Sequence, residues 1–499
     1  MVSGKRSRWI PALLALAVLI SCNRYRETEF FTGRIDFPVQ PSLGVKEAMA
    51  ARVVPHQRQL EWQKLEMTAF IHFTVNTFTG LEWGTGKESP AIFNPTSLDA
   101  GQWVRVLSEA GMKMVIITAK HHDGFCLWPT KTTTHSVASS PWKNGQGDVI
   151  RELKDSCEAN GMKFGVYLSP WDRNASCYGD SPAYNRFYIE QLTELLTWYG
   201  KVDEVWFDGA NGEGPDGRRQ EYDWQAYYDL IRKLQPDAVV AIMGEDVRWV
   251  GTESGYGRET EWSATVLAPG GTPESLAINE ALGVNPMSPD LGSSSLLNRA
   301  EHLFWYPAEV DVSIRPGWFW RASEDTLVKD VAKLADIYLS SVGRNAVLLL
   351  NVPPDNRGLI TEHDIRSLQG LKAWIDEMYA TDLMNGARPY GSGASALIDG
   401  DNCTSWSPRR NRVASFVPAI AATFNVAMLQ EDISKGQRVE KFIIEALANK
   451  QWDTIATGTT IGYKRMIRFP EVKADEIRLT IVSSRATPYI STFALYHAD

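Results

Sequence analysis

The sequence predicts an α/β fold, in which a (β/α)8-like barrel is followed by a C-terminal all-β sandwich. Between residues 67 and 380, short apolar runs alternate with helical patterns, and at least seven of these runs can be traced as strands. Continuous apolar strands joined by crossover helices indicate a parallel sheet that is buried on both faces. From residue 396 onward the runs are strand-like and contain no long helical pattern, which indicates the sandwich.

The strands of the predicted barrel are short and mostly apolar, at residues 67–73, 114–119, 164–169, 204–208, 238–243, 310–314 and 346–351. The helical segments lie at residues 99–111, 148–161, 184–199, 224–236, 325–341 and 361–380. Gly111 in EAGMKM and Gly161 in EANGMKF each follow a helix where a positive φ angle ends it. No GxGxxG or P-loop motif follows any strand, so the usual nucleotide-binding reason for an open sheet is missing.

The composition limits the class of protein. A chain of 499 residues with 44% hydrophobic content is long enough for two domains, and we place the barrel at residues 51–383 and a discoidin-like β-sandwich at residues 384–499. The formal net charge of −9 argues against a nucleic-acid partner, because its phosphates would be repelled. The 18 tryptophans suit ligands that are apolar on one side and hydroxylated on the other, such as sugars, although large barrels also use tryptophan in packing.

The first residues predict an exported lipoprotein. The basic stretch GKRSRW precedes an apolar segment at residues 10–21, whose twelve residues would span only ~18 Å as a helix, short of a ~30 Å hydrocarbon core. Residues 1–21 therefore resemble a signal peptide. The sequence LISC resembles a bacterial lipoprotein box, which implies a lipid anchor on Cys22, a tether at residues 22–50, and a location in the periplasm or at the cell surface. The alternative is an ordinary signal peptide followed by a chance cysteine.

The remaining cysteines do not define a site. Cys126, Cys157, Cys177 and Cys403 are scattered and form no CxxC pair. This spacing indicates neither a zinc site nor a disulfide framework, and it leaves a single disulfide open.

Polar side chains stand at the ends of four consecutive predicted strands. His72 closes the first, His121 and His122 follow the second, Tyr167 lies in the third, and Asp208 ends the fourth. In a barrel the carboxyl ends of the strands form the open face where reactive groups gather. Each residue also has a structural alternative: the aspartate precedes a glycine and could start a turn, and two adjacent histidines on an extended chain would point to opposite sides. Their convergence favours a site.

Five longer motifs resemble the retaining α-L-fucosidases of glycoside hydrolase family 29. They are KHHDGFCLWPTKTTTHS, VWFDGA, WVGTESG, SIRPGWFW and SVGRNAVLLLNVPPDNRG, and the resemblance covers residues 65–358 and extends into the sandwich. It implies hydrolysis of terminal fucose by double displacement, with retention of the anomeric configuration and two carboxyl groups ~5–5.5 Å apart. By its place in the motif, Asp208 corresponds to the nucleophile. The implied partner is a fucosylated oligosaccharide or glycoconjugate.

The second carboxylate has five candidates after the fifth strand: Glu245, Asp246, Glu253, Glu259 and Glu261. The stretch DVRWVGTESG resembles the branch of the family that is selective for α-1,3/1,4-linked fucose, which implies Glu253 as the general acid/base. The structural alternative is a solvated loop glutamate.

The resemblance also implies a fucose pocket. Its hydroxyl-binding side chains would be His72, His121 and His122, with Glu82, Trp83 and Tyr167 nearby and Arg248 as a weaker candidate. Trp206 would face the same side of its strand as the nucleophile, and either Trp318 or Trp320 would close over the methyl edge of the sugar. No cofactor and no catalytic metal are expected, because no set of carboxylates or histidines has metal-ligand spacing.

Two rival functions remain. A metal-dependent barrel hydrolase is suggested by HHD at a strand end, but none of the eight histidines forms the usual His-x-His pair. A catalytically inactive glycan-binding protein is the other, and the presence of Asp208 and Glu253 argues against it.

The predicted sandwich contains Trp406 in DGDNCTSWSP, which resembles discoidin-like modules that often bind glycans. It could equally buttress the barrel.

Overall fold

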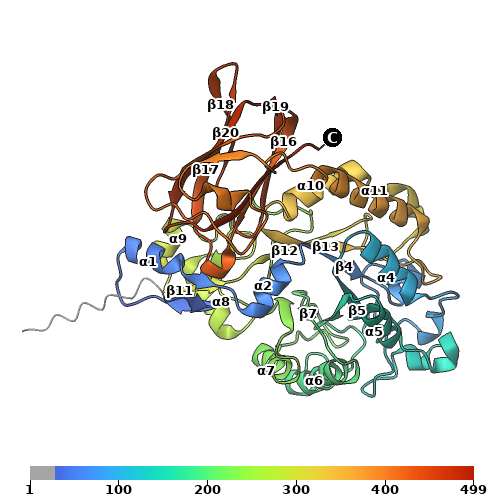
Figure 1. Ribbon diagram of the computed structural model, residues 1–499. Coiled ribbons are helices and arrows are strands. Elements are labelled where there is room, and N and C mark those ends of the chain that lie inside the picture. The colour runs from blue at the N-terminus through green and yellow to red at the C-terminus, as the bar shows by residue number, and fades with distance from the viewer. Residues whose placement is uncertain (1–28, 499) are drawn as a thin grey trace, which may run out of the picture.

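The computed structural model describes residues 29–498 (Figure 1). The predicted signal peptide and Cys22 lie outside the described residues. Within the described range, no helix has both the length and the apolar character needed to cross a bilayer. The four cysteines in this range are free thiols, so none of them forms the single disulfide that the sequence left open.

Eight parallel strands form the central sheet, in the order β8-β7-β6-β5-β4-β13-β12-β9. Their bounds are β4 Met67–Ile71, β5 Met114–Lys120, β6 Lys163–Leu168, β7 Glu204–Phe207, β8 Val239–Ile242, β9 Arg248–Trp249, β12 Ala308–Ser313 and β13 Ala346–Asn351. A single bridge between Ala241 and Val247 joins the two edges, so the sheet closes into a barrel. The predicted barrel is confirmed. The two-residue strand β9 was not predicted, because so short a strand leaves no pattern in the sequence.

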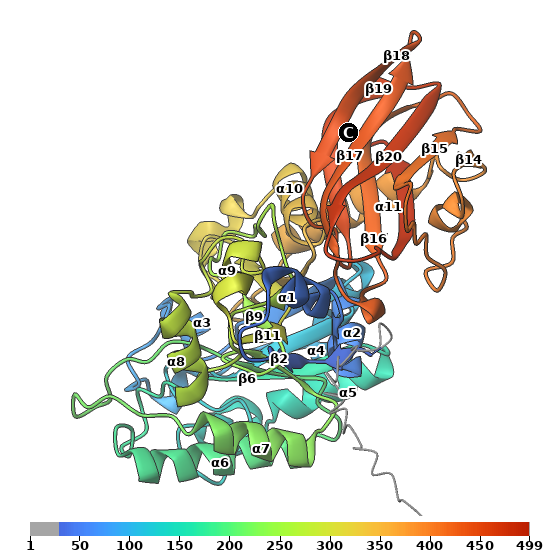
Figure 2. The same ribbon diagram turned by 90° about the vertical axis from the view of Figure 1, so that its left-hand side faces the viewer.

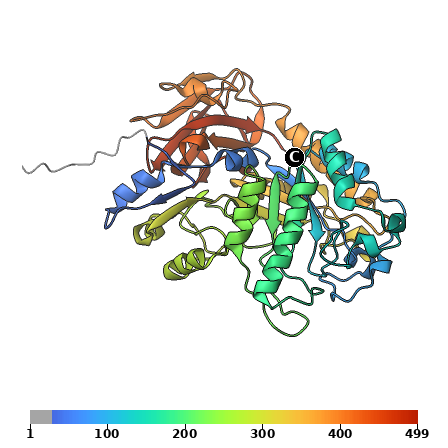
Figure 3. The ribbon, with the colours of Figure 1, turned by 90° about the horizontal axis from the view of Figure 1, so that it is seen from below.

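Six long helices follow the barrel strands and cover its outside (Figures 1 and 3): α4 Ala100–Glu109, α5 Val149–Ala159, α6 Ser181–Trp198, α7 Trp224–Leu234, α10 Val331–Ser341 and α11 Glu362–Tyr379. All but α11 begin after an aspartate whose side chain accepts a backbone N–H of the first turn. The helix predicted at residues 325–341 starts later, since the preceding residues form a 3-10 turn at Ala322–Leu327 and Asp330 provides the cap. No helix separates β8 from β9.

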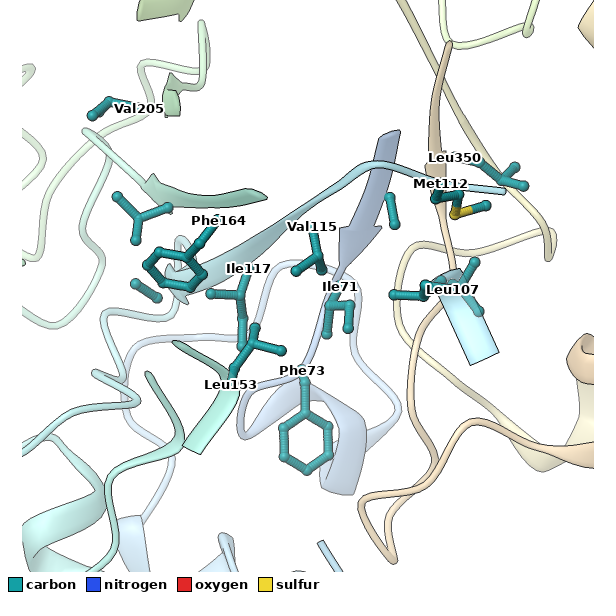
Figure 4. Packing of buried hydrophobic residues seen from close by; sticks show 14 of the residues in the cluster. Ile71, Phe73, Leu107, Met112, Val115, Ile117, Leu153, Phe164, Val205 and Leu350 are labelled. Carbon is teal, nitrogen blue, oxygen red and sulfur yellow. The ribbon is translucent and has the colours of Figure 1, made fainter. Parts of the chain in front are cut away.

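The alternation of side chains along each strand divides the barrel into two apolar layers. Ile71, Val115 and Ile117 point outward and pack with Leu107 of α4 and Leu153 of α5 (Figure 4). Their neighbours in sequence point into the barrel, where Phe70, Met114, Ile116, Tyr167 and Trp206 form a separate cluster. The inner layer leads directly to the carboxyl ends of the strands.

The chain between β9 and β12 leaves the barrel. It forms α8 Pro273–Leu282, α9 Ser294–Arg299 and the strands β10 Ala264–Thr265 and β11 His302–Trp305. Strand β11 pairs with β10 on one side and with β2 Arg34–Asp36, near the N-terminus, on the other. Residues 29–66 add β1 Phe31–Thr32, α1 Leu43–Ala50, β3 Val53–Val54 and α2 Gln57–Gln63. The part of the predicted tether that is described is therefore folded against the body of the protein.

Two antiparallel sheets follow α11 and lie on one side of the barrel (Figure 2). The larger has β14 Arg388–Tyr390, β15 Val413–Val417, β20 Glu476–Ser484, β17 Val439–Ala448 and β18 Gln451–Gly458, and the smaller has β19 Arg465–Lys473, β16 Thr423–Glu431 and β21 Ile490–Tyr496. Trp406 is only 1% exposed and donates its indole N–H to Ser392 O. This tryptophan is a core residue of the C-terminal sheets and offers no platform for a sugar.

Two glutamates lie inside the barrel without a cationic partner. Glu204 of β7 accepts the indole N–H of Trp62 and Glu309 of β12 accepts that of Trp206, and each keeps one oxygen without a hydrogen-bond partner among the described residues. Burial, and then the charge of Glu204, raises the pKa of Glu309 well above its usual value, and burial likewise raises that of Glu204. At neutral pH the pair therefore retains bound protons.

This pair makes stability depend on pH. Because the pKa of Glu309 is higher in the folded than in the unfolded chain, the free energy of unfolding falls by up to about 1.4 kcal/mol per pH unit above ~4.3. We expect Glu309→Gln to remove most of that loss between pH 5 and pH 8, as measured by urea denaturation. The exposed control Glu109→Gln should behave like the unmodified protein. Equal pH dependence in Glu309→Gln and the unmodified protein would contradict this assignment.

Candidate active site

A cavity of about 150 Å³ opens at the carboxyl ends of the barrel strands. Every predicted site residue except Arg248 lines it. The lining residues are Phe70, His72, Glu82, Trp83, His121, His122, Tyr167, Trp206, Asp208, Ala210, Glu253, Asp311 and Trp318. A second, more polar cavity of about 290 Å³ lies elsewhere, beside β2 and α8, and its carboxylates Glu245 and Asp246 are held in ion pairs with Arg232.

Asp208 follows β7 directly, and two donors orient its carboxylate. Oδ1 accepts the backbone N–H of Ala210 at 2.6 Å, which is the turn contact expected of an Asp-Gly pair. Oδ2 accepts the hydroxyl of Tyr167 at 3.1 Å and lies 3.8 Å from Nε2 of His122. The side chain is 25% exposed. Asp208 therefore both forms the turn and presents one oxygen among the residues of the cavity.

The three histidines of the cavity are neutral at physiological pH, because burial lowers the pKa of each one, that of His72 to about 3. The amide nitrogen of Asn351 donates to Ser313 and to Trp318 O, so its carbonyl oxygen accepts from Nδ1 of His72 at 2.9 Å. Nε2 of His72 is then the acceptor. Such neutral rings can exchange hydrogen bonds with hydroxyl groups without adding charge.

His121 and His122 do not point to opposite sides, as an extended chain would require. Both line the cavity, with ring centroids 4.2 Å apart. Strand β5 ends at Lys120, and the chain then turns, with Gly124 N–H bonded to His121 O. Both were predicted to line the pocket; the structural alternative fails because the strand period no longer applies beyond the last strand residue.

Glu253 lies on the loop after β9, exposed at the cavity mouth. Its carboxylate accepts the indole N–H of Trp318 at 3.3 Å. Partial burial of the carboxyl group raises its pKa, the Trp318 hydrogen bond opposes this, and the charges of Asp208 and Glu82 raise it further. The other four candidate acids lie outside the cavity lining and are held in ion pairs with arginines: Glu245 and Asp246 with Arg232, Glu259 with Arg344 and Arg465, and Glu261 with Arg248 and Arg258.

Of the two tryptophans of SIRPGWFW, only Trp318 lines the cavity. Trp318 lines the cavity, and its backbone N–H donates to Glu82 at 2.6 Å. Trp320 lies outside the cavity lining and donates its indole N–H to Asp325 at 3.1 Å. Trp83 stands at the rim and is 56% exposed. The open choice between the two tryptophans is therefore decided for Trp318.

Arg248 does not reach the cavity. Its side chain is 1% exposed and bonds to Glu261, to Tyr306 O and to Trp262 O. The sequence offered no sign of this, because the ion pair joins the short strand β9 to Glu261, near the far end of the loop that contains Glu253.

Sequence reasoning missed Asp311, which lies within β12 and lines the cavity. It accepts the indole N–H of Trp249 at 2.8 Å. Burial raises its pKa to about 7, and the charges of Glu253 and Asp208 act in the same direction. A carboxylate between two valines of a strand was the available signal, but only strand ends had been considered. Phe70 and Ala210 were missed as ordinary apolar residues.

Comparison with known proteins gives the same result as the geometry. The model of the family described as Alpha-L-fucosidase matches residues 48–379. The chain belongs to the α-L-fucosidases, glycoside hydrolase family 29. It is 41% identical to Alpha-L-fucosidase 1 of Arabidopsis thaliana over 462 residues, which cover 89% of this chain and 87% of that one.

Solved structures agree with this membership. The crystal structure of an alpha-L-fucosidase from Bacteroides ovatus is 56% identical in sequence to this chain. Its TM-score is 0.89, and the match covers 94% of this chain and 78% of that one. A family 29 fucosidase from Ruminococcus gnavus, solved in complex with fucose, is 30% identical, with a TM-score of 0.78 over 90% of this chain and 95% of that one. The enzyme is therefore a glycosidase that acts on α-L-fucosides. Among residues 29–498, no three His, Cys, Asp or Glu side chains are grouped so that they could hold a metal ion.

The cavity wall can be tested by fluorescence. Saturating L-fucose should change the tryptophan emission of the fucosidase, because Trp318 would contact the sugar. Trp318→Phe should show a clearly smaller change than the matched variant Trp320→Phe, whose indole lies outside the lining. The reverse order of the two variants would contradict the placement.

Proposed function

We propose that the protein is an exo-acting retaining α-L-fucosidase that removes terminal α-1,3- or α-1,4-linked fucose from glycans. Asp208 is the nucleophile and Glu253 is the general acid/base. The observation that supports this most is the presence of these two carboxyl groups in one cavity with different surroundings. Asp208 is oriented by Tyr167 and a backbone N–H, whereas Glu253 has a raised pKa.

The reaction has two steps. In the first, the Asp208 carboxylate attacks the anomeric carbon while protonated Glu253 gives its proton to the departing glycosidic oxygen, and a fucosyl ester of Asp208 forms. In the second, the Glu253 carboxylate accepts a proton from water as that water attacks the anomeric carbon. Fucose leaves with its configuration retained, and both carboxyl groups return to their starting states.

The pKa of Glu253 changes in the sense that this cycle needs. While Asp208 is ionised, its negative charge helps to keep Glu253 protonated, as a general acid must be. Once Asp208 is esterified, that charge is gone and the pKa of Glu253 falls. Glu253 is then better suited to act as the base for the attacking water.

The shape of the cavity supports the exo mode. Phe70 and Trp206 belong to the apolar cluster inside the barrel and close the inner end of the cavity. A sugar can enter only from the mouth, where Glu253 lies, so the linkage must be at the outer end of the bound residue. The neutral histidines provide partners for its hydroxyls, and Trp318 provides an apolar wall for its methyl group.

The linkage preference rests on the stretch DVRWVGTESG, in which Glu253 is the acid that lines the cavity.

The same proposal includes export as a lipoprotein anchored through Cys22, with no other membrane contact. This export rests on the basic stretch GKRSRW, the apolar segment at residues 10–21 and the LISC sequence, and intact-mass analysis of the membrane fraction would detect the acyl chains.

The two carboxylates can be told apart with azide and an aryl α-L-fucoside. Asp208→Gly should lose hydrolysis and yield a fucosyl azide of inverted configuration, because azide takes the place of the nucleophile. Glu253→Ala should yield the retained azide, and its kcat/KM on oligosaccharides should fall by about 10²–10⁴-fold. The control Glu245→Gln should keep activity. An inverted azide from Glu253→Ala would show that Glu253 is the nucleophile and would contradict the assignment.

Linkage is tested with two substrates at equal concentration. We expect release of fucose from a Lewis-type trisaccharide and little release from an α-1,2-linked oligosaccharide, quantified by chromatography of the products. Comparable rates on both would refute the linkage assignment and leave the fucosidase activity standing.

A further inference from the structure

The loop that contains Glu253 has few restraints near that residue. We call residues 249–262 the acid/base loop. Gly251 and Gly255 have φ angles of 104° and 85°, which only glycine adopts readily, so the segment between them is a distinct turn at the cavity mouth. Residues 252–254 are exposed, and the hydrogen bond from Trp318 reaches Glu253 at a long 3.3 Å. The position of Glu253 must therefore depend on how the ends of the loop are held.

The two ends of the acid/base loop are tied together in the interior. Arg248, which directly precedes it, forms an ion pair with Glu261 near its far end, and the side chains of both are at most 2% exposed. Arg248 also donates to Trp262 O at 3.2 Å. An unpaired buried charge is strongly unfavourable, so the two side chains stay paired while they are buried. Water that reached them would solvate both charges and weaken this constraint. The base of the loop is thus closed by an interaction that needs a cover.

The C-terminal sheets supply that cover at the far end of the loop. Thr460 Oγ1 accepts the N–H of Glu261 at 3.0 Å, and the side-chain amide of Gln437 accepts from Ser263 N at 2.7 Å and donates to Glu261 O at 2.9 Å. Gln437 is fully buried and Thr460 is 2% exposed. Two further contacts, from Thr459 and Arg465, hold Glu259 at 3.0 Å and 2.7 Å. We call these four residues of the C-terminal region the clamp.

The clamp is distinct from the general contact between the two domains. Lys464 forms an ion pair with Glu66 at 2.7 Å, and this contact between the domains does not involve the acid/base loop. The barrel also holds the loop, through Gly257 N–H on Ser340 O and Arg344 on Gly257 O. Arg344 and Asn345 of the barrel also contact residues 259–263, through Glu259 and Glu261, and the clamp adds to the restraint there.

We propose that the C-terminal sheets act as a positioning element for the general acid/base: the clamp residues fix the far end of the acid/base loop and thereby the reach of Glu253 to the glycosidic oxygen. This rests on the proposed role of Glu253. Since a displacement of about 1 Å in a catalytic group can cost on the order of 10²-fold in rate, loss of a single clamp contact should be visible in the proton-transfer step.

The test compares substrates that differ in their need for an acid. An oligosaccharide has a poor leaving group that must be protonated, whereas 2,4-dinitrophenyl α-L-fucoside has a leaving group that departs without it. Thr460→Val and Gln437→Met, made separately, should lower kcat/KM on the oligosaccharide by about 10-fold or more and on the aryl fucoside by less than about 3-fold. Thr460→Ser, which keeps the hydroxyl, should restore the original ratio.

Two controls separate the possible outcomes. Glu66→Gln removes a contact between the domains that does not involve the loop, and it should leave the ratio of the two substrates unchanged. Glu253→Ala should change the ratio in the same direction as the clamp variants, and more strongly. If Glu253→Ala does not change it, the proposed role of Glu253 fails. If Glu253→Ala changes it but the folded clamp variants lower both rates equally, or neither, the positioning role is overturned.

Discussion

The active site depends on the alternation of side chains along parallel strands in a closed barrel. Tyr167 and Trp206 are register partners on β6 and β7, and their rings stack at 5.1 Å because both point inward. Asp208 directly follows the last residue of β7 and lines the same cavity as Trp206. The Tyr167 hydroxyl reaches it from the neighbouring strand. A slip of one residue in this register would turn the carboxylate toward the helices and out of the cavity.

Burial dominates the electrostatics of this interior. It lowers the pKa values of the three cavity histidines and raises those of Glu253, Asp311 and the deeper pair Glu204 and Glu309. The cavity thus holds neutral rings and weakened acids around Asp208, which is partly solvated and held by two donors. In the proposed reaction, the neutral hydrogen-bonding groups around Asp208 suit attack on a carbon that gains positive charge in the transition state.

The barrel departs from regular geometry where the second carboxylate is held. No helix follows β8, strand β9 has two residues, and the chain then makes a long excursion before it returns at β12. Glu253 lies at the start of that excursion, on a loop whose base is closed by Arg248 and Glu261. A loop can bring an acid over the mouth of the cavity where a strand end cannot. Its cost is conformational freedom, which the contacts from the C-terminal sheets reduce.

The sequence by itself determined the barrel, its principal strands and helices, and most of the residues of the site. The barrel and the residues at four strand ends follow from local rules: apolar runs mark strands, glycines end helices, and polar residues at the ends of parallel strands meet on one face. Glu82, Trp83, Glu253 and Trp318 came from the family resemblance. Only the tertiary structure decided that Trp318 and not Trp320 enters the cavity, that His121 and His122 share a side, that Asp311 belongs to the site, and that Arg248 does not. Each of these depends on contacts between segments far apart in the chain, or on backbone turns beyond a strand end, and no local pattern records either.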